Sequence, residues 1–566
     1  MRTGFLFLVL TTFSLACGQL LPVDSVWIAR TLRQMSIEEK VGHLLMPVHQ
    51  SLDQSRQYVQ QYHVGGFWFA KAKAPAIVHE LNALQRLSRW GLLIAADFEK
   101  GVGTHVDGGI DLPGAMALAA TGDTAAVYQA AAITAQEARA IGVHLDFAPV
   151  VDVNNNPKNP VINVRSFGEN PALVAMYGAA AVRGYQDHGL LSTLKHYPGH
   201  GNTTVDTHVD LATIGGSMKE LQEVELQPYR TILSEARPAA VMVSHLWVPA
   251  IDTVPVPATF SARAVTGILR QQLGFDGIIC TDAMVMGAIR EHYDSADAAV
   301  KAVLAGVDLI VWPQDVAEAY HSLLTAARSG RIGEERLNAS VRRILSAKTR
   351  VGLQRQREIV EENVLASLST AENLERAGRI AGKCITLARD DRHLIPLSPD
   401  QRVLLLTLDN HTGPALMSRT SVTFPFEIEK RAVSVLSVSL PDTLSREKAA
   451  QLLELAQRAE VVVVGAYVRI FMASGSVDLP ADKQKLLEQL AEVNSNLVLV
   501  SFGNPYVGAA IRGLSTYLCA YDNADVLQLA AARALYGEIR IQGSLPVTVN
   551  ASLPAGSGIR LEPRPE

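Results

Sequence analysis

One stretch near the middle of the chain gathers side chains that can move protons and hold polar groups. It runs from residue 195 to residue 208 and reads Lys-His-Tyr-Pro-Gly-His-Gly-Asn-Thr-Thr-Val-Asp-Thr-His. One lysine, three histidines and one aspartate therefore lie close together in the sequence. A packed core does not require these residue types, because an ionisable group is costly to bury without a partner. The stretch therefore predicts a catalytic loop rather than a solvated loop with chance histidines.

Proline and glycine residues indicate how this stretch is positioned. The apolar run 189–194 precedes it and is typical of a buried strand. Pro198, Gly199 and Gly201 then allow neither a continuing strand nor a helix. We therefore expect the chain to leave the strand near Lys195 and to form a loop.

Apolar runs alternate with alanine-rich helical stretches over about the first 350 residues. Strands that are buried on both faces are continuously apolar, as in parallel sheets. Eight such runs predict a (β/α)8 barrel. A doubly wound sheet is the alternative, but no glycine-rich dinucleotide fingerprint is present. The eight runs are 41–48, 64–69, 92–96, 143–151, 190–194, 239–243, 277–280 and 308–312.

Charged and hydrogen-bonding residues lie at or just after the ends of several of these apolar runs. In (β/α)8 barrels the chemistry lies at the carboxyl ends of the strands. Each residue alone could cap a helix or pair with a neighbour, but their coincidence at one end of a barrel predicts an active site. These residues are Asp97 and Glu99, Asp146 and Asp152, Lys195 and His196, Ser244 and His245, and Thr281 and Asp282.

The sequence divides into four parts. Residues 1–16 have a basic start and an apolar run too short to span a bilayer, which is typical of a signal peptide. The barrel is expected over 24–355 and a helical connector over 356–398. Apolar runs then alternate with helical stretches over 399–554, which predicts a smaller α/β sandwich domain.

The N-terminus and the composition indicate an exported globular protein. Residues 14–17 read Ser-Leu-Ala-Cys and resemble a loose bacterial lipobox. Cys17 is therefore expected to be lipidated, with ordinary signal cleavage as the alternative. Either outcome places the protein outside the cytoplasm, in the periplasm or anchored to a membrane. The net charge of −5 gives no reason to expect nucleic acid as a partner.

The remaining cysteines Cys280, Cys384 and Cys519 each lie in an apolar run. This position favours buried free thiols over a disulfide framework. The sequence carries no indication of the oligomeric state.

The string 195–201 with Asp206-x-His208 resembles the signature of bacterial β-N-acetylglucosaminidases of glycoside hydrolase family 3. The resemblance extends over nearly the whole mature chain. It includes the stretches 112–117, 165–168, 274–277, 281–284 and 501–505.

The resemblance implies a retaining glycosidase that releases terminal β-linked N-acetylglucosamine, for example from peptidoglycan fragments, without a metal or cofactor. It makes Asp282 the nucleophile and His208, paired with Asp206, the general acid/base. A histidine is workable in this role because its unperturbed pKa of about 6.5 lies near the operating pH. The residues that the resemblance assigns to sugar binding are Asp97, Arg165, Lys195 and His196.

One motif departs from the family's pattern. The family usually has Asp-x-Glu-Gly-Gly-Arg where this chain has Lys100 and Val102 in place of the first glycine and the arginine. Some of the contacts that this motif makes to the edge of the sugar are therefore expected to differ from those in other members of the family.

Several alternatives remain open at the level of sequence. Within the family, the enzyme could be a β-glucosidase, or a phosphorylase in which phosphate replaces water as acceptor. From other classes, His196, His200, Asp206 and His208 could bind a metal in a barrel metallohydrolase, although glycines between them give no fixed coordination geometry. A non-catalytic sugar-binding lipoprotein is the second rival, which the presence of Asp282, Asp206 and His208 disfavours.

Overall fold

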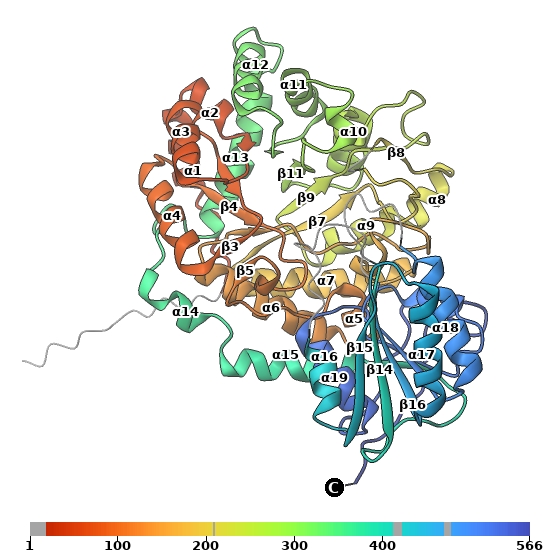
Figure 1. Ribbon diagram of the computed structural model, residues 1–566. Coiled ribbons are helices and arrows are strands. Elements are labelled where there is room, and N and C mark those ends of the chain that lie inside the picture. The colour runs from red at the N-terminus through yellow and green to blue at the C-terminus, as the bar shows by residue number, and fades with distance from the viewer. Residues whose placement is uncertain (1–18, 208–209, 411–421, 469–476, 566) are drawn as a thin grey trace, which may run out of the picture.

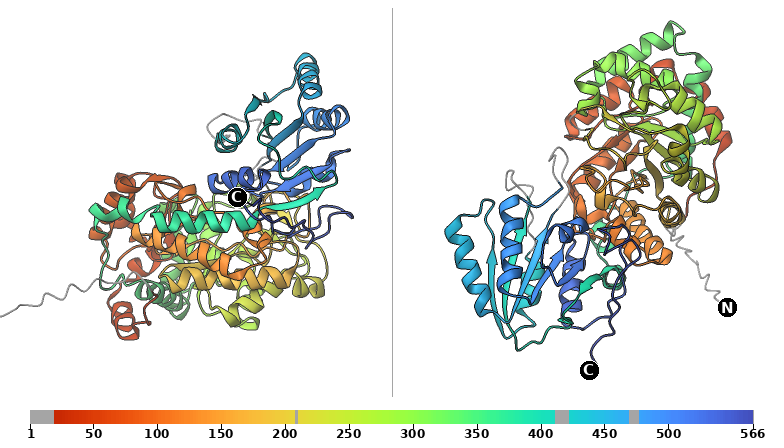
Figure 2. Two further views of the ribbon diagram at one scale, coloured as in Figure 1. Left: turned by 90° about the horizontal axis from the view of Figure 1, so that it is seen from below. Right: turned by 90° about the vertical axis from the view of Figure 1, so that its right-hand side faces the viewer.

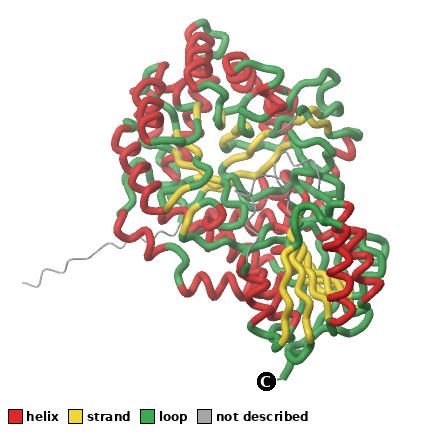
Figure 3. Tube along the Cα trace, viewed as in Figure 1, coloured by secondary structure: helices red, strands yellow, loops and turns green. Residues whose placement is uncertain are grey.

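The computed structural model describes residues 19–207, 210–410, 422–468 and 477–565 (Figure 1). Cys17 and the stretch 1–16 predicted to be a signal peptide lie outside these ranges, and so does His208. The chain forms two lobes that pack against each other, a larger one of helices around short central strands and a smaller one around a second sheet (Figures 2 and 3). No helix in the described ranges is both long enough and apolar enough to span a membrane.

Eight parallel strands form the centre of the larger lobe. Six of them lie in the order β11-β9-β7-β6-β4-β2, and β1 pairs with β12. Parallel bridges from Val48 to Trp68 and from Cys280 to Leu309 join these two sheets into a closed ring. The predicted (β/α)8 barrel is thereby confirmed. The strands are β1 (Leu45–Met46), β2 (Gly66–Trp68), β4 (Leu93–Ala96), β6 (Leu145–Asp146), β7 (Leu191–Tyr197), β9 (Ala240–Val243), β11 (Ile278–Thr281) and β12 (Ile310–Val311).

Helices surround these strands, as the alternation in the sequence predicts. Ser36 and Glu39 form a capping box at the start of α2, in which each side chain accepts from the other residue's backbone N–H. The helices of this lobe are α1 (Ser25–Gln34), α2 (Ile37–Gly42), α3 (Leu52–Tyr62), α4 (Ala74–Leu87), α5 (Ala115–Ala120), α6 (Thr124–Ala140), α7 (Pro171–Asp187), α8 (Met218–Glu223), α9 (Leu226–Glu235), α10 (Gly287–Arg290), α11 (Ser295–Ala305), α12 (Val316–Arg328) and α13 (Glu334–Arg350). Short strand pairs β3 (Ala72–Lys73) with β5 (Val106–Asp107) and β8 (Ala212–Thr213) with β10 (Leu246–Trp247) lie in the loops.

Three parts of this lobe are less regular than a simple alternation of strands and helices. The run 41–48 begins inside α2, and its strand is confined to β1. The stretch 218–236 is two helices, because Pro228 lacks a backbone N–H and is tolerated only in the first turn of a new helix, α9. The stretch 261–273 contains a π-helix over Arg263–Gln272.

The smaller lobe holds a six-stranded sheet between helices. Its strand order is β13-β18-β17-β16-β14-β15, and only β13 runs antiparallel to its neighbour. Helices α17 and α18 cover one face of this sheet, and α16 and α19 cover the other (Figure 1). The strands are β13 (Thr386–Asp390), β14 (Arg402–Asp409), β15 (Ser434–Ser439), β16 (Val461–Tyr467), β17 (Leu497–Ser501) and β18 (Thr516–Cys519). The helices are α16 (Thr423–Glu429), α17 (Arg446–Arg458), α18 (Ala481–Val493) and α19 (Asp525–Leu535).

The connection between the lobes is only partly helical. Helices α14 (Val364–Ser367) and α15 (Ala371–Cys384) lie in the stretch 356–398, but this stretch also contributes strand β13 to the second sheet. Thr386 and Leu387 are fully buried in that strand. The second sheet therefore includes residues that were expected to belong to the connector between the domains. Cys280, Cys384 and Cys519 are buried free thiols, as predicted.

Candidate active site

The residues predicted to bind and act on a substrate lie at the carboxyl ends of the barrel strands. Asp97 follows β4, Asp282 follows β11, and Arg165 ends the short helix Asn163–Arg165 in the loop after β6. Lys195 and His196 lie within β7 and not in the following loop, which corrects the expectation from sequence. The reason is backbone pairing: Lys195 bridges to Val150, and the strand continues to Tyr197.

Four of these side chains form one network of alternating charge. Lys195 Nζ lies 2.6 Å from Asp97 Oδ1 and 2.7 Å from Glu99 Oε1. The Arg165 guanidinium binds both oxygens of Glu99, through Nη2 at 2.6 Å and Nε at 3.0 Å. The structure therefore brings Asp97, Lys195 and Arg165 together, as predicted. Glu99 joins them, and the sequence placed this residue at the site without assigning it a specific function.

The network is held in its charged form. Burial opposes ionisation of Glu99, but Arg165 and Lys195 hold the pKa of its carboxyl well below the usual range. Burial likewise opposes the charge on Lys195, and the carboxylates of Asp97 and Glu99 raise its pKa above the ordinary value. Two carboxylates thus balance two cations, and this network presents fixed donors and acceptors with little net charge of its own.

Two tryptophans complete the edge of the site next to Asp97. The indole Nε1–H of Trp68, the last residue of β2, donates to Asp97 Oδ2 at 2.7 Å. Trp312, which follows β12, stacks on Trp68 with ring centroids 5.0 Å apart and an angle of 28° between the planes. Each oxygen of Asp97 is therefore fixed by a donor on a different strand.

A second set of contacts orients His196. Its Nδ1 lies 2.7 Å from Asp152 Oδ2, and its Nε2 lies 3.5 Å from Arg165 Nη2. Because a guanidinium can only donate, Nε2 is the acceptor and Nδ1–H donates to Asp152. Burial would raise the pKa of Asp152, but His196 lowers it below its ordinary value. The predicted binding residue His196 is thus locked in one orientation beside Arg165.

His200 shapes the loop that follows β7. Its two ring nitrogens lie 2.9 Å from Thr203 Oγ1 and 3.0 Å from Thr207 Oγ1. Burial lowers the pKa of His200 to about 4, an effect that the charges of Asp152 and Asp282 partly oppose. His200 is therefore neutral near pH 7, and both of its nitrogens are occupied within the loop.

The loop that carries Asp206 lies next to the segment that follows Asp282. Asp282 directly follows β11; its backbone N–H donates to the Val243 carbonyl at 3.0 Å, and its Oδ1 accepts from the Ala283 N–H at 2.7 Å. Thr207 accepts a hydrogen bond from Ala288 of α10, which places the segment 206–207 beside the segment that follows Asp282. Asp206 is buried, and His208 lies just beyond the described residues.

Asp146 lies beneath the charged network. It is fully buried, and its Oδ1 accepts the backbone N–H of Phe98 at 2.8 Å. Burial raises the pKa of Asp146 to about 8, so the group is mostly protonated near pH 7 and adds no third negative charge beside Asp97 and Glu99. Among the residues that the structure describes, no three His, Cys, Asp or Glu side chains are grouped so as to hold a metal ion.

Sequence reasoning missed the roles of Glu99, Asp152 and Trp68. A signal existed for each: Glu99 and Asp152 follow predicted strands, and Trp68 is a large aromatic residue at a strand end. The pairing of Glu99 with Arg165 and of Trp68 with Asp97 joins residues from different strands, and periodicity carries no information about such contacts.

Comparisons with known proteins agree with this architecture. The model of the glycosyl hydrolase family 3 N-terminal domain matches residues 36–347, and that of the family's C-terminal domain matches residues 385–558. The chain is 28% identical over 537 residues to a β-N-acetylglucosaminidase/β-glucosidase of Cellulomonas fimi, covering 92% of this chain and 95% of the relative.

Two solved structures share both lobes. A family 3 β-N-acetylglucosaminidase from Paenibacillus sp. str. FPU-7 superposes with a TM-score of 0.82 at 34% identity, covering 91% of this chain and 99% of that one. The β-glucoside phosphorylase BglX, with 2FGlc bound, superposes with a TM-score of 0.84 at 25% identity, covering 93% of this chain and 97% of that one. With both of its domain models matched in order, the chain belongs to glycosyl hydrolase family 3.

Proposed function

We propose that this protein is a retaining exo-glycosidase that releases terminal β-linked N-acetylglucosamine. The observation that carries the proposal is the network of Asp97, Glu99, Lys195 and Arg165, which offers fixed hydrogen-bonding groups at the carboxyl end of the barrel that also carries Asp282. The relative from Cellulomonas fimi and the Paenibacillus structure, both named for this sugar, support the choice of substrate. Fragments of peptidoglycan are the substrates that an exported enzyme of this type would meet.

Asp97 and Lys195 are well placed to hold sugar hydroxyls. A carboxylate has about four lone-pair sites. Lys195 and Trp68 occupy one site on each Asp97 oxygen, so two sites remain for hydroxyl donors. Arg165 and Lys195 provide N–H groups around the same space, next to the ring of His196, whose single N–H is directed at Asp152. A terminal sugar ring would be held here by its hydroxyl edge, which is how an exo-acting enzyme selects chain ends.

The proposed chemistry uses two displacements at the anomeric carbon. The carboxylate of Asp282 attacks this carbon while His208 donates a proton to the departing glycosidic oxygen, which breaks the bond to the aglycone. His208 then removes a proton from water, whose oxygen attacks the same carbon and releases Asp282 and the sugar. Two inversions give net retention. Asp206 would orient the imidazole of His208 and support its protonated form.

Paired chromogenic substrates test the proposal directly. The rate on a nitrophenyl β-N-acetylglucosaminide is expected to exceed the rate on the matching β-glucoside at equal concentration. Comparable rates on both would remove the assignment of the acetamido group. Repeating the assay with and without inorganic phosphate and analysing the sugar product separates hydrolysis from phosphorolysis, the chemistry for which BglX is named.

Two rival functions give different results in simple assays. A metallohydrolase would lose activity after exhaustive treatment with a chelator and regain it with metal, whereas the proposed glycosidase would keep its rate. A sugar-binding lipoprotein would bind N-acetylglucosamine but release no nitrophenol.

Trp68→Phe tests whether the indole N–H positions Asp97. The phenyl ring still stacks on Trp312, but the donor to Asp97 Oδ2 is lost. Hydrogen bonds to charged groups contribute strongly, so KM for the nitrophenyl β-N-acetylglucosaminide is expected to rise about tenfold. Trp312→Phe is the matched control, because it alters the same stack and leaves the bond from Trp68 to Asp97 intact. An unchanged KM in Trp68→Phe would show that this bond does not position Asp97.

Export and anchoring are proposed from the sequence, since Cys17 lies outside the described residues. If Cys17 carries lipid, Cys17→Ala is expected to move the protein from the membrane fraction to the soluble fraction, because acyl chains and not the fold hold it there. The specific activity should not change. Fractionation followed by immunoblotting checks this, and wild-type protein found wholly in the soluble fraction would contradict it.

A further inference from the structure

The second domain contacts the barrel loop that carries Asp97 and Glu99. Lys100, the residue after Glu99, places its Nζ 2.8 Å from Oδ1 of Asp522 and 3.5 Å from Oδ1 of Asp111. Asp111 belongs to the barrel, whereas Asp522 lies between β18 and α19 of the second domain. The backbone carbonyl of Lys100 also accepts from the Leu112 N–H at 2.8 Å, so the ion pair is attached to an ordered loop.

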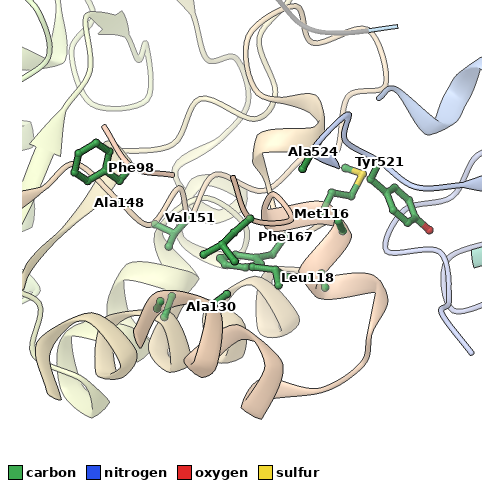
Figure 4. Packing of buried hydrophobic residues seen from close by; sticks show 14 of the residues in the cluster. Phe98, Met116, Leu118, Ala130, Ala148, Val151, Phe167, Tyr521 and Ala524 are labelled. Atoms are coloured by element: carbon green, nitrogen blue, oxygen red, sulfur yellow. The ribbon is translucent and has the colours of Figure 1, made fainter. Parts of the chain in front are cut away.

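This ion pair lies at the edge of an apolar core that continues across both domains. Met116 and Phe167 of the barrel and Tyr521 and Ala524 of the second domain belong to one cluster, and Met116 lies beside Tyr521 (Figure 4). A Cβ on Gly114 would lie only 2.9 Å from Asp522 Oδ2.

The side chain of Asp522 is only 12% exposed and that of Lys100 is 30% exposed. Burial alone would lower the pKa of Lys100, but Asp522 and Asp111 raise it above its ordinary value. The pair is therefore charged and fixed in place, unlike a solvated surface pair.

The loop that carries Arg165 is attached to the second domain as well. Thr548 donates its backbone N–H to Glu169 Oε2 at 2.8 Å and its hydroxyl to Glu169 Oε1 at 2.7 Å. Gly168 has a φ of +142°, and a Cβ there would lie 2.6 Å from the Pro546 carbonyl oxygen. Only glycine permits this close approach, three residues after Arg165.

The two loops meet where Arg165 binds Glu99. Every proposed catalytic and sugar-binding residue falls within 36–347, the range matched by the N-terminal domain model, so the second domain is not needed to supply one of them. We propose that the second domain sets the affinity for substrate, with Asp522 as a positioning residue that acts through Lys100 to fix Glu99 and, with it, Arg165 and Lys195. This inference rests on the proposed function, because those residues are taken to bind the sugar.

Asp522→Asn in the full-length protein tests the inference, since it removes the charge and keeps the size. We expect KM for the nitrophenyl β-N-acetylglucosaminide to rise about tenfold while kcat changes less than about threefold. The charge swap Lys100→Asp with Asp522→Lys is expected to recover most of the affinity that each single change loses. Lys383→Gln is the matched control, because it breaks the Lys383–Asp123 ion pair, which is 3.0 Å long and lies outside the catalytic loops.

Hydrogen exchange gives a readout that does not depend on activity. Asp522→Asn is expected to speed exchange of the backbone amides over 98–112, and Lys383→Gln is not. Unchanged KM and unchanged exchange in a folded Asp522→Asn protein would overturn the inference, and so would a charge swap no better than the single variants. A wild-type protein with no glycosidase activity would contradict the proposed function instead, and the exchange data would still decide whether Asp522 fixes the loop.

Discussion

Asp282→Asn is expected to lower kcat by about four to six orders of magnitude on every substrate, because the carboxylate that attacks the anomeric carbon is gone. The loss should be the same for nitrophenyl sugars and disaccharides, since both pass through the same glycosyl-enzyme. Asparagine keeps an oxygen that can accept the Ala283 N–H, now 2.7 Å from Asp282 Oδ1, so the local backbone should be preserved. Melting temperature and steady-state kinetics check this expectation.

Asp282→Ala provides the complementary experiment. It opens a space below the sugar into which a small anion such as azide can enter and attack the anomeric carbon once. Because a single displacement inverts the configuration, the expected product is the α-glycosyl azide. Wild-type rates in Asp282→Asn, or no effect of azide on Asp282→Ala together with a folded protein, would show that the nucleophile lies elsewhere.

His208→Ala is expected to affect substrates according to their leaving groups. A nitrophenolate departs with little proton assistance, so its release should slow by about tenfold or less, whereas cleavage of a disaccharide should slow by about a thousandfold. Hydrolysis of the glycosyl-enzyme also loses its base. A burst of nitrophenolate followed by a slow steady state is therefore expected, and stopped-flow absorbance measures it.

Asp206→Ala is the graded control for this result. Asp206 is buried and lies in the loop that leads to His208, and we assign it only the orientation and support of the imidazole. It should therefore show the same pattern as His208→Ala in a milder form. Equal losses on nitrophenyl and disaccharide substrates in His208→Ala, with no burst, would make His208 a binding or structural residue.

The barrel could be predicted because its strands are buried on both faces. Apolar runs such as 92–96 and 239–243 have no polar residue to interrupt them, and β4 and β9 lie within them. The end of β7 could not be predicted in this way. Lys195 and His196 look like loop residues, yet their backbone pairs with neighbouring strands while their side chains contact the site. Strand β13 was missed because it is short, partly polar and directly follows α15.

The sequence predicts which residues form the site better than it predicts the contacts between them. Asp97, Arg165, Lys195 and His196 converge because the carboxyl ends of parallel strands meet at one end of a barrel. The bonds from Trp68 to Asp97 and from Lys100 to Asp522 depend on how loops and domains pack. The sequence shows that Lys100 replaces a glycine of the family's motif. Its partner Asp522 lies in the other domain, so the sequence alone does not identify the contact.

The most direct test of the proposed mechanism is mass spectrometry of a trapped glycosyl-enzyme. His208→Ala, mixed with nitrophenyl β-N-acetylglucosaminide and quenched in acid during the burst, should carry one N-acetylglucosaminyl group per chain. After digestion, the group is expected on the peptide that contains Asp282, and Asp282→Asn treated in the same way should carry none. A burst without a covalent adduct, or an adduct on a residue other than Asp282, would contradict the account.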